Sequence, residues 1–181
     1  MFWGWLLLAL FVALIFYWLF ILTEGTFLGT RVVVLLYDWY AQRYDRVKKM
    51  QFVNELAYLG LPISRALVGI EHPLIVDIAT GTGRLPLAMV RQPDFDGRVL
   101  GIEPSGRMLA EAQRALAGFE RAALVRGDAR ALGLADASAD AVTCLEALEF
   151  MTRPERVQDE MLRVLKPGGV LLLSNRVGPA A

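Results

Sequence analysis

The stretch LIVDIATGTG, residues 74–83, decides the fold because it joins an apolar strand to a glycine-rich turn. Residues 74–79 are apolar apart from Asp77, and a short run of this kind is typical of a buried strand in a parallel sheet. Gly81 and Gly83 let the backbone turn sharply and approach a ligand, because neither carries a Cβ. In α/β folds ligands bind where such strands end. The turn is therefore the first candidate binding site.

After this turn the chain alternates apolar runs with helical patterns. Four more runs predict strands, at 98–103, 122–127, 140–145 and 170–175. Helical patterns connect several of them, at 84–91, 105–119 and 153–169. In the last pattern Val157, Met161, Leu162 and Leu165 share one face, and Pro167-Gly168 is predicted to end the helix. These units predict a Rossmann-like, doubly wound α/β domain with five parallel strands and helices on both faces. Residues 32–70 add two helical patterns before the first strand.

The first 22 residues have a different composition from the rest. They contain one residue outside the hydrophobic set, Gly4, and the first charged residue is Glu24. As a helix this stretch would measure ~33 Å, slightly more than the ~30 Å hydrocarbon core of a bilayer. A signal peptide would have a basic start and a small-residue cleavage site, and a core helix would have one polar face. Because the stretch has none of these features, we expect residues 1–22 to form a transmembrane anchor.

Basic residues predict the orientation of this anchor. They all follow it, at Arg31, Arg43, Arg46, Lys48 and Lys49. The positive-inside rule then predicts a single-pass membrane protein whose domain lies in the cytoplasm. Residues 27–40 are too short and too polar for a second span, so they either lie along the membrane surface as an amphipathic helix or begin the domain. We expect three parts: the anchor at 1–22, a juxtamembrane helical segment at 23–50, and a binding domain at 51–181.

The composition of the remaining chain excludes several classes of protein. All 38 charged residues lie after residue 22, and their 19 basic and 19 acidic side chains cancel. Zero net charge without a long basic run argues against nucleic-acid binding. Cys144 is the one cysteine, so the sequence predicts neither a disulfide framework nor a cysteine metal site. Nothing in the sequence predicts an oligomeric state.

Two acidic residues make the glycine turn more specific. Glu103 ends the second predicted strand, 20 residues after Gly83, where a carboxylate can accept both hydroxyls of a ribose. The alternative is a solvated acid at a strand end. Asp77 lies within the first strand, and its alternative role is to cap the following helix. A dinucleotide motif would need glycine at position 86, where the chain has Pro86, so an adenosine ligand without a pyrophosphate fits better.

Four motifs in order resemble class I S-adenosylmethionine-dependent methyltransferases, in particular the ubiquinone and menaquinone biosynthesis group. They are VDIATGTG (76–83), GIEPSGRML (101–109), GDARAL (127–132) and LKPGGVLLL (165–173). YDWYAQRYD (37–45) resembles a Tyr-Asp repeat ahead of the core, and the resemblance covers about 37–176. It implies S-adenosyl-L-methionine as the cofactor. Ala79 stands where the family often has glycine. The family's sheet usually continues beyond the fifth strand, so we expect either a fragment or a short member lacking the last strands.

The resemblance also implies roles for particular residues. The residues that the resemblance places beside the methionine part of the cofactor are Asp77, Ala79, Thr80, Gly81, Thr82 and Gly83. The residues that the resemblance places beside the ribose, the adenine or the sulfonium are Glu103, Pro104, Met108, Asp128, Ala129, Leu145 and Glu146.

Methyl transfer needs alignment of the two substrates, and many acceptors also need a base. Glu146 and Glu149 are candidates for that base, with solvated loop acids as the alternative. Tyr37, Tyr40 and Tyr44 either close over the ligand or belong to a helix that packs on the core. We therefore expect a membrane-anchored methyltransferase acting on a small, lipophilic acceptor such as a quinone precursor or a lipid. The alternative is a protein that binds S-adenosylmethionine, or serves as a scaffold, without turnover.

Overall fold

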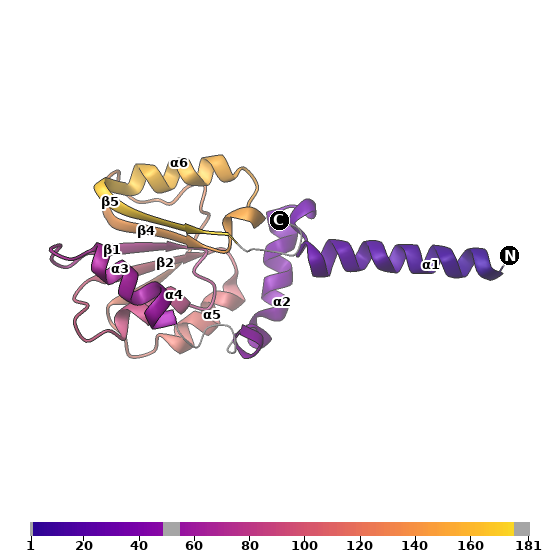
Figure 1. The fold of residues 1–181 in the computed structure, drawn as a ribbon, viewed down its shortest axis with the longest axis horizontal. Coiled ribbons are helices and arrows are strands. Elements are labelled where there is room, and N and C mark those ends of the chain that lie inside the picture. The colour runs from indigo at the N-terminus through magenta and orange to yellow at the C-terminus, as the bar shows by residue number, and fades with distance from the viewer. Residues whose placement is uncertain (1, 49–54, 176–181) are drawn as a thin grey trace.

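A computed structural model describes residues 2–48 and 55–175 (Figure 1). Five parallel strands form one sheet, in the order β3-β2-β1-β4-β5. The strands are β1 (Leu74–Ile78), β2 (Arg98–Glu103), β3 (Ala122–Arg126), β4 (Ala139–Leu145) and β5 (Leu165–Ser174). The strand order reverses between β1 and β4, where Asp77 pairs with Thr143. The predicted five-stranded parallel sheet is confirmed.

Helices cover both faces of this sheet. The helices in chain order are α1 (Phe2–Tyr17), η1 (Trp18–Leu22), η2 (Thr26–Leu28), α2 (Thr30–Lys48), η3 (Leu56–Gly60), α3 (Leu61–Ala66), α4 (Arg84–Val90), α5 (Gly106–Ala115), η4 (Leu148–Phe150) and α6 (Pro154–Val164). Val76 and Ile78 of β1 pack in one core with α6, whereas Ile75 packs in a second core with α3 and α4. The alternation of side chains along β1 therefore fills two cores, as a doubly wound sheet requires.

The helix that was predicted to end at Pro167-Gly168 ends earlier in the structure. Helix α6 ends at Val164, and Leu165 already belongs to β5, where it pairs with Ala139. The next described pairing joins Ala141 to Val170, so residues 166–169 bulge out of the ladder. Gly168 has a φ of +79° in this bulge, a conformation that glycine adopts without strain. Leu162 is 58% exposed and does not share the buried face of Val157 and Met161.

The N-terminal apolar helix projects away from the domain (Figure 1). Residues Trp3–Leu22 are long and apolar enough to cross a membrane, and no part of that stretch is buried in the protein. A tight corner at residues 23–29 then turns the chain into α2, with Glu24, Gly25 and Gly29 at positive φ. Helix α2 packs against α5 and lies across the end of the sheet (Figure 1). Residues 32–48 are thus part of one helix that covers the domain.

Candidate functional site

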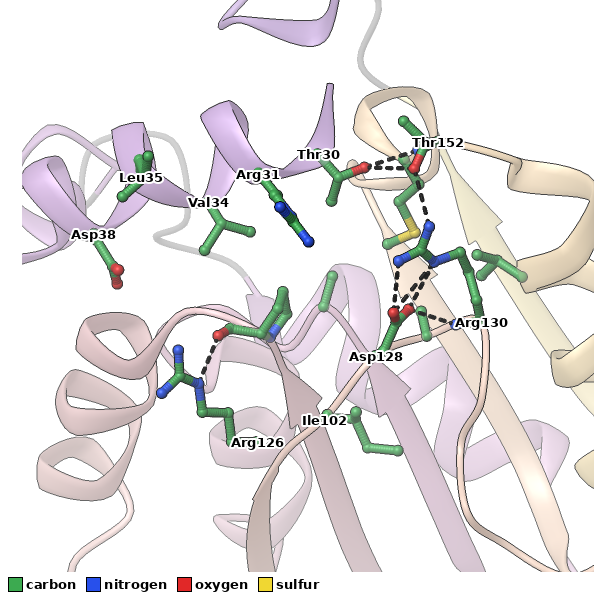
Figure 2. Close-up of a pocket in the computed structure, with 16 residues that line it drawn as sticks. Thr30, Arg31, Val34, Leu35, Asp38, Ile102, Arg126, Asp128, Arg130 and Thr152 are labelled. Atoms are coloured by element: carbon green, nitrogen blue, oxygen red, sulfur yellow. Dashed lines mark hydrogen bonds and ion pairs between the residues drawn. The ribbon is translucent and has the colours of Figure 1, made fainter. Parts of the chain in front are cut away.

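Two adjoining cavities lie between α2 and the carboxyl ends of the strands. The larger has a volume of about 550 Å³ and the smaller about 100 Å³. Thr30, Val34, Ala79, Pro104 and Met151 line both of them. Figure 2 shows the larger cavity, with α2 on one side and the strand ends on the other. The position agrees with the general rule that ligands bind at the switch point of an open α/β sheet.

Glu103 lies at the end of β2 and lines the smaller cavity. Its side chain is buried, and its two oxygens accept the backbone N–H groups of Gly81 and Ser105, each at 3.0 Å. Burial raises the pKa of Glu103 to about 7, although these two N–H donors act in the opposite direction. Each carboxylate oxygen keeps a further lone pair, so Glu103 can accept hydroxyl donors from a ligand.

Asp77 lies behind the glycine turn. Its oxygens accept the hydroxyls of Thr80 and Thr143, both at 2.6 Å. Burial raises the pKa of Asp77 to about 6, against the lowering effect of these two hydroxyls and of Arg84. Asp77 therefore ties the turn to β4 and sets the conformation of the residues that line the cavity.

The turn itself needs positive φ values at alternate positions. Gly81 and Gly83 have φ values of +57° and +82°, and Ala79 has +55°. A Cβ on Gly83 would lie 3.2 Å from the Cβ of Ala112, so glycine also allows the turn to pack on α5. A residue with a side chain in this region costs roughly 1–2 kcal/mol relative to its usual conformation. Ala79 therefore adopts, at this cost, a conformation that glycine would adopt more easily.

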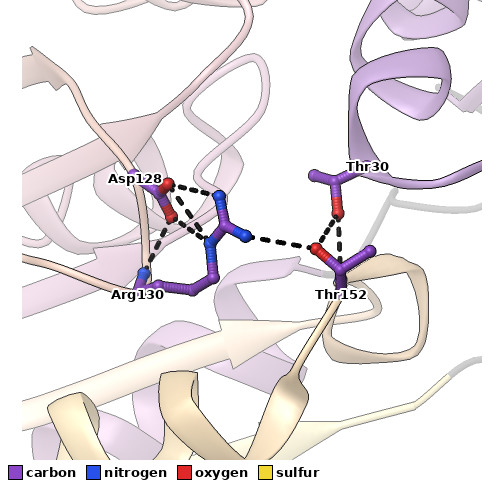
Figure 3. A network of polar contacts seen from close by, with 4 residues as sticks. All are labelled: Thr30, Asp128, Arg130 and Thr152. Atoms are coloured by element: carbon purple, nitrogen blue, oxygen red, sulfur yellow. Dashed lines mark hydrogen bonds and ion pairs between the residues drawn. The ribbon is translucent and has the colours of Figure 1, made fainter.

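Asp128 lines the larger cavity and is held by Arg130 (Figure 3). The guanidinium contacts both carboxylate oxygens, with Nη2 at 2.7 Å from Oδ2 and Nε at 3.0 Å from Oδ1. This contact lowers the pKa of Asp128. Arg130 also donates to the Thr152 hydroxyl at 3.3 Å, and the backbone N–H of Thr152 donates to the Thr30 hydroxyl at 2.9 Å. The network joins the loop after β3 to α2 across the cavity.

Helix α2 is attached to the domain through Asp38. Its carboxylate accepts the hydroxyl of Ser105 and, at 3.1 Å, the backbone N–H of Arg107. Ser105 is also the N-cap of α5, where it accepts the N–H of Met108 at 3.0 Å. The same residues therefore begin α5 and hold α2 over the cavity.

Aromatic residues of α2 extend the apolar wall of the smaller cavity. Tyr37 and Tyr44 line it, and their ring centroids are 6.0 Å apart. The Tyr37 hydroxyl donates to Glu24 at 2.8 Å, which links the cavity to the corner after the apolar helix. Burial raises the pKa of Tyr37 well above its ordinary value, and Tyr44, Glu103, Glu149 and Glu146 add to this effect. Tyr40 contacts Tyr44 edge to face.

The structure brings most of the predicted site residues together. Those that line one or both cavities are Ala79, Gly81, Glu103, Pro104, Met108, Asp128, Ala129, Leu145 and Glu146. Asp77, Thr80, Thr82 and Gly83 are buried behind them in the turn. Glu149 lies in η4, beside Tyr37 and not on the cavity wall with Glu146.

The sequence reasoning named Tyr37, Tyr40 and Tyr44 of α2 but missed other residues of this helix and one loop that line the larger cavity. Thr30, Arg31, Val34, Asp38, Arg130 and Thr152 line the larger cavity. The Tyr37-Asp38 pair and the periodicity of residues 32–48 are the signals in the sequence for α2. Thr152 carried no local signal, because only the fold brings it near Thr30.

Comparison with known proteins decides the family. The family described as methyltransferase domain matches residues 76–173, more than half of the chain. The chain belongs to the S-adenosylmethionine-dependent methyltransferases. The chain is 33% identical over 141 residues to a demethylmenaquinone methyltransferase of Clavibacter sepedonicus, covering 78% of this chain and 56% of that protein. It is 32% identical over 138 residues to a malonyl-[acyl-carrier protein] O-methyltransferase of Xylella fastidiosa, covering 76% and 43%.

A solved structure shares the fold of this chain. A Methanococcus maripaludis protein assigned to the S-adenosyl-L-methionine-dependent methyltransferases superposes with a TM-score of 0.65 at 22% identity, covering 76% of this chain and 63% of the other. The chain spans about half the length of the curated relatives it matches.

The residues at the site fit S-adenosyl-L-methionine, the cofactor of the family. Glu103 provides a buried carboxylate with free lone pairs at the end of β2, which suits the two hydroxyls of a ribose. Met108 provides an apolar surface, and Asp128 an acceptor for an amino group. When bound, the cofactor supplies an electrophilic methyl group on a sulfonium.

Proposed function

We propose that this methyltransferase is anchored in a membrane and transfers a methyl group to a small, lipophilic acceptor of quinone-like or lipid-like chemistry. The observation that carries this proposal is the continuity of α1, the corner and α2. The apolar helix leads within seven residues into the helix that forms a wall of both cavities. An acceptor dissolved in the bilayer would therefore be close to the site.

The smaller cavity suits an apolar acceptor. Val33, Phe150 and Met151 line it together with the rings of Tyr37 and Tyr44. Glu146 and Glu103 are the acidic side chains on this apolar wall. We assign Glu103 to the ribose hydroxyls, Asp128 to the adenine amino group, and Glu146 to the proton of an acceptor that must be deprotonated.

The relatives and the charge pattern support the remaining parts of the proposal. One relative is named for demethylmenaquinone, which supports a quinone-like acceptor, and the other is named for a malonyl group on an acyl-carrier protein. Arg31 and Arg43 follow the apolar helix and are exposed, which favours a cytoplasmic domain. We infer that residues 1–22 serve as the anchor, 23–50 as the junction and 51–181 as the cofactor domain.

The test uses the full chain in lipid nanodiscs. Formation of S-adenosylhomocysteine is measured after adding S-adenosylmethionine, with nanodiscs made either from bacterial membrane lipid extract or from synthetic phospholipid alone. We expect product with the extract and much less with synthetic lipid. Glu103→Ala should abolish it, whereas Glu120→Ala, which removes an exposed acid, should not. Cofactor binding without product in either lipid would favour the scaffold alternative, and a lack of cofactor binding would contradict the proposal.

A further inference from the structure

Helix α2 has an exposed face that borders the larger cavity, since Arg31 and Leu35 on this face are among the residues that line it. Leu35 is 66% exposed and Trp39 75% exposed. Arg31 and Arg43 are also exposed, and the four residues follow one another at intervals of four, which places them in one stripe along the helix. The opposite side of α2, with Val33 and Ala41, is buried against the domain. We call Arg31, Leu35, Trp39 and Arg43 the outer stripe.

The apolar anchor joins α2 on the side of the outer stripe. A Cβ on Gly25 in the corner would lie 3.0 Å from Leu36 and 3.2 Å from Val32, so these two side chains pack against the corner. By helical register Val32 and Leu36 flank the outer stripe and lie far from the buried side. Figure 1 agrees, since α1 leaves α2 on the side opposite the sheet and runs at a steep angle to it.

Aromatic residues mark the level at which the corner would meet the membrane interface. Trp18, near the end of the apolar stretch, stacks on Phe27 of η2, with ring centroids 5.1 Å apart. Both rings are exposed to solvent, at 47% and 69%. Trp and other aromatic side chains favour the boundary between hydrocarbon and headgroups. With the corner at that depth, α2 runs along the bilayer surface and not away from it.

We propose that the outer stripe of α2 rests on the surface of the bilayer. Leu35 and Trp39 enter the boundary between acyl chains and headgroups, and Arg31 and Arg43 contact lipid phosphates at either end. The proposal rests on the membrane anchoring proposed above. It adds that the wall of the site is itself a lipid-contacting element. Because Arg31 and Leu35 of the outer stripe also line the larger cavity, that cavity then lies directly beside the bilayer surface.

Spin labels placed one at a time on the full chain in nanodiscs test this arrangement. The labelled variants are Leu35→Cys and Trp39→Cys on the outer stripe, Leu8→Cys in the anchor, and Val68→Cys as a control. Val68 is 81% exposed and lies beyond α3, at the other end of the domain. Cys144 stays in place because its thiol is buried in β4. The measurement compares collisions of each label with lipid-soluble oxygen and with a water-soluble nickel chelate.

Labels at positions 35 and 39 should collide more often with oxygen than with nickel, and the label at 68 should show the reverse. If position 8 is in lipid but positions 35 and 39 match position 68, the outer stripe does not touch the bilayer, although the anchor stands. If position 8 itself is in water, the anchor fails and this proposal fails with it.

Discussion

The carboxylate of Glu103 accepts the backbone N–H of Gly81 at 3.0 Å, so the end of β2 directly fixes the glycine turn after β1. One buried side chain thus orders the turn and presents its remaining lone pairs to the cavity. Because a charge held in this position is poorly solvated, its protonation should control ligand binding near neutral pH.

Cofactor affinity should therefore depend on pH through Glu103. Its pKa is about 7 in the folded chain, above the ordinary value for glutamate, so the folded state favours the protonated form. The carboxylate form accepts ribose hydroxyls, and affinity should fall about tenfold per pH unit below 7. Calorimetry with 5′-methylthioadenosine measures this effect, because that ligand has ribose and adenine but no amino acid group that titrates.

The stability of the fold should depend on pH in the opposite direction to the cofactor affinity. A carboxyl whose pKa is raised by folding stabilises the fold below its unfolded pKa, and this contribution is lost as the pH rises to about 7.

Glu103→Gln should bind 5′-methylthioadenosine about 10- to 100-fold more weakly at pH 8, with little dependence of the affinity on pH. Asp77→Asn is the control, since Asp77 titrates near pH 6. If Asp77→Asn removes the pH dependence and Glu103→Gln keeps it, the assignment is wrong.

The contact between Asp128 and Arg130 should oppose ligand entry. Asp128→Ala should weaken binding of 5′-methylthioadenosine about tenfold, because an acceptor for the adenine amino group is lost. Arg130→Ala should have a different effect, a faster association rate, because the carboxylate no longer has to exchange its arginine partner for the ligand. Stopped-flow binding separates the two rates. Equal weakening by both substitutions would show that the pair acts only as a structural contact.

Asp38 should determine how firmly α2 covers the site. Asp38→Ala leaves the Ser105 hydroxyl and the Arg107 N–H without this acceptor, at a cost of about 1–3 kcal/mol. Hydrogen exchange of α2 amides should then become faster, while exchange in β1 and β4 stays slow. Asp94→Ala, in an exposed loop, is the matched control. Unchanged protection of α2 in Asp38→Ala would contradict this role.

Glu146 and Glu149 should differ as candidates for the base. Glu146→Gln should lower kcat by about 10²-fold or more without weakening cofactor binding, because Glu146 lines the smaller cavity. Glu149→Gln should affect kcat less, since Glu149 lies beside Tyr37 in η4. Steady-state kinetics on the nanodisc preparation compare them. A larger loss of kcat in Glu149→Gln would reverse the assignment.

Much of the fold follows from local patterns in the sequence. Short apolar runs around Asp77 and Glu103 gave the strand positions, because buried parallel strands have a distinctive composition. The end of α6 was predicted wrongly, since Leu165 continues the apolar pattern of the helix while its backbone pairs with Ala139. Strand pairing depends on a residue far away in the chain, and helical periodicity contains no information about it.

The candidate site, like the fold, was predictable from the sequence only in part. Glu103 was identified by its distance from Gly83, which reflects the fixed size of a strand–helix–strand unit. The position of Thr152 beside Thr30 was not predictable, because 122 residues separate them and neither belongs to a motif. Long-range contacts of this kind arise from how α2 packs on the finished sheet.

The most direct test of membrane-linked methyl transfer follows the methyl group itself. The full chain is assembled in nanodiscs of membrane lipid extract, given S-adenosylmethionine with a tritiated methyl group, and the lipid is extracted into organic solvent. We expect tritium in the organic phase, with none above background in Glu103→Ala. Tritium that stays in the aqueous phase, despite bound cofactor, would contradict a lipophilic acceptor.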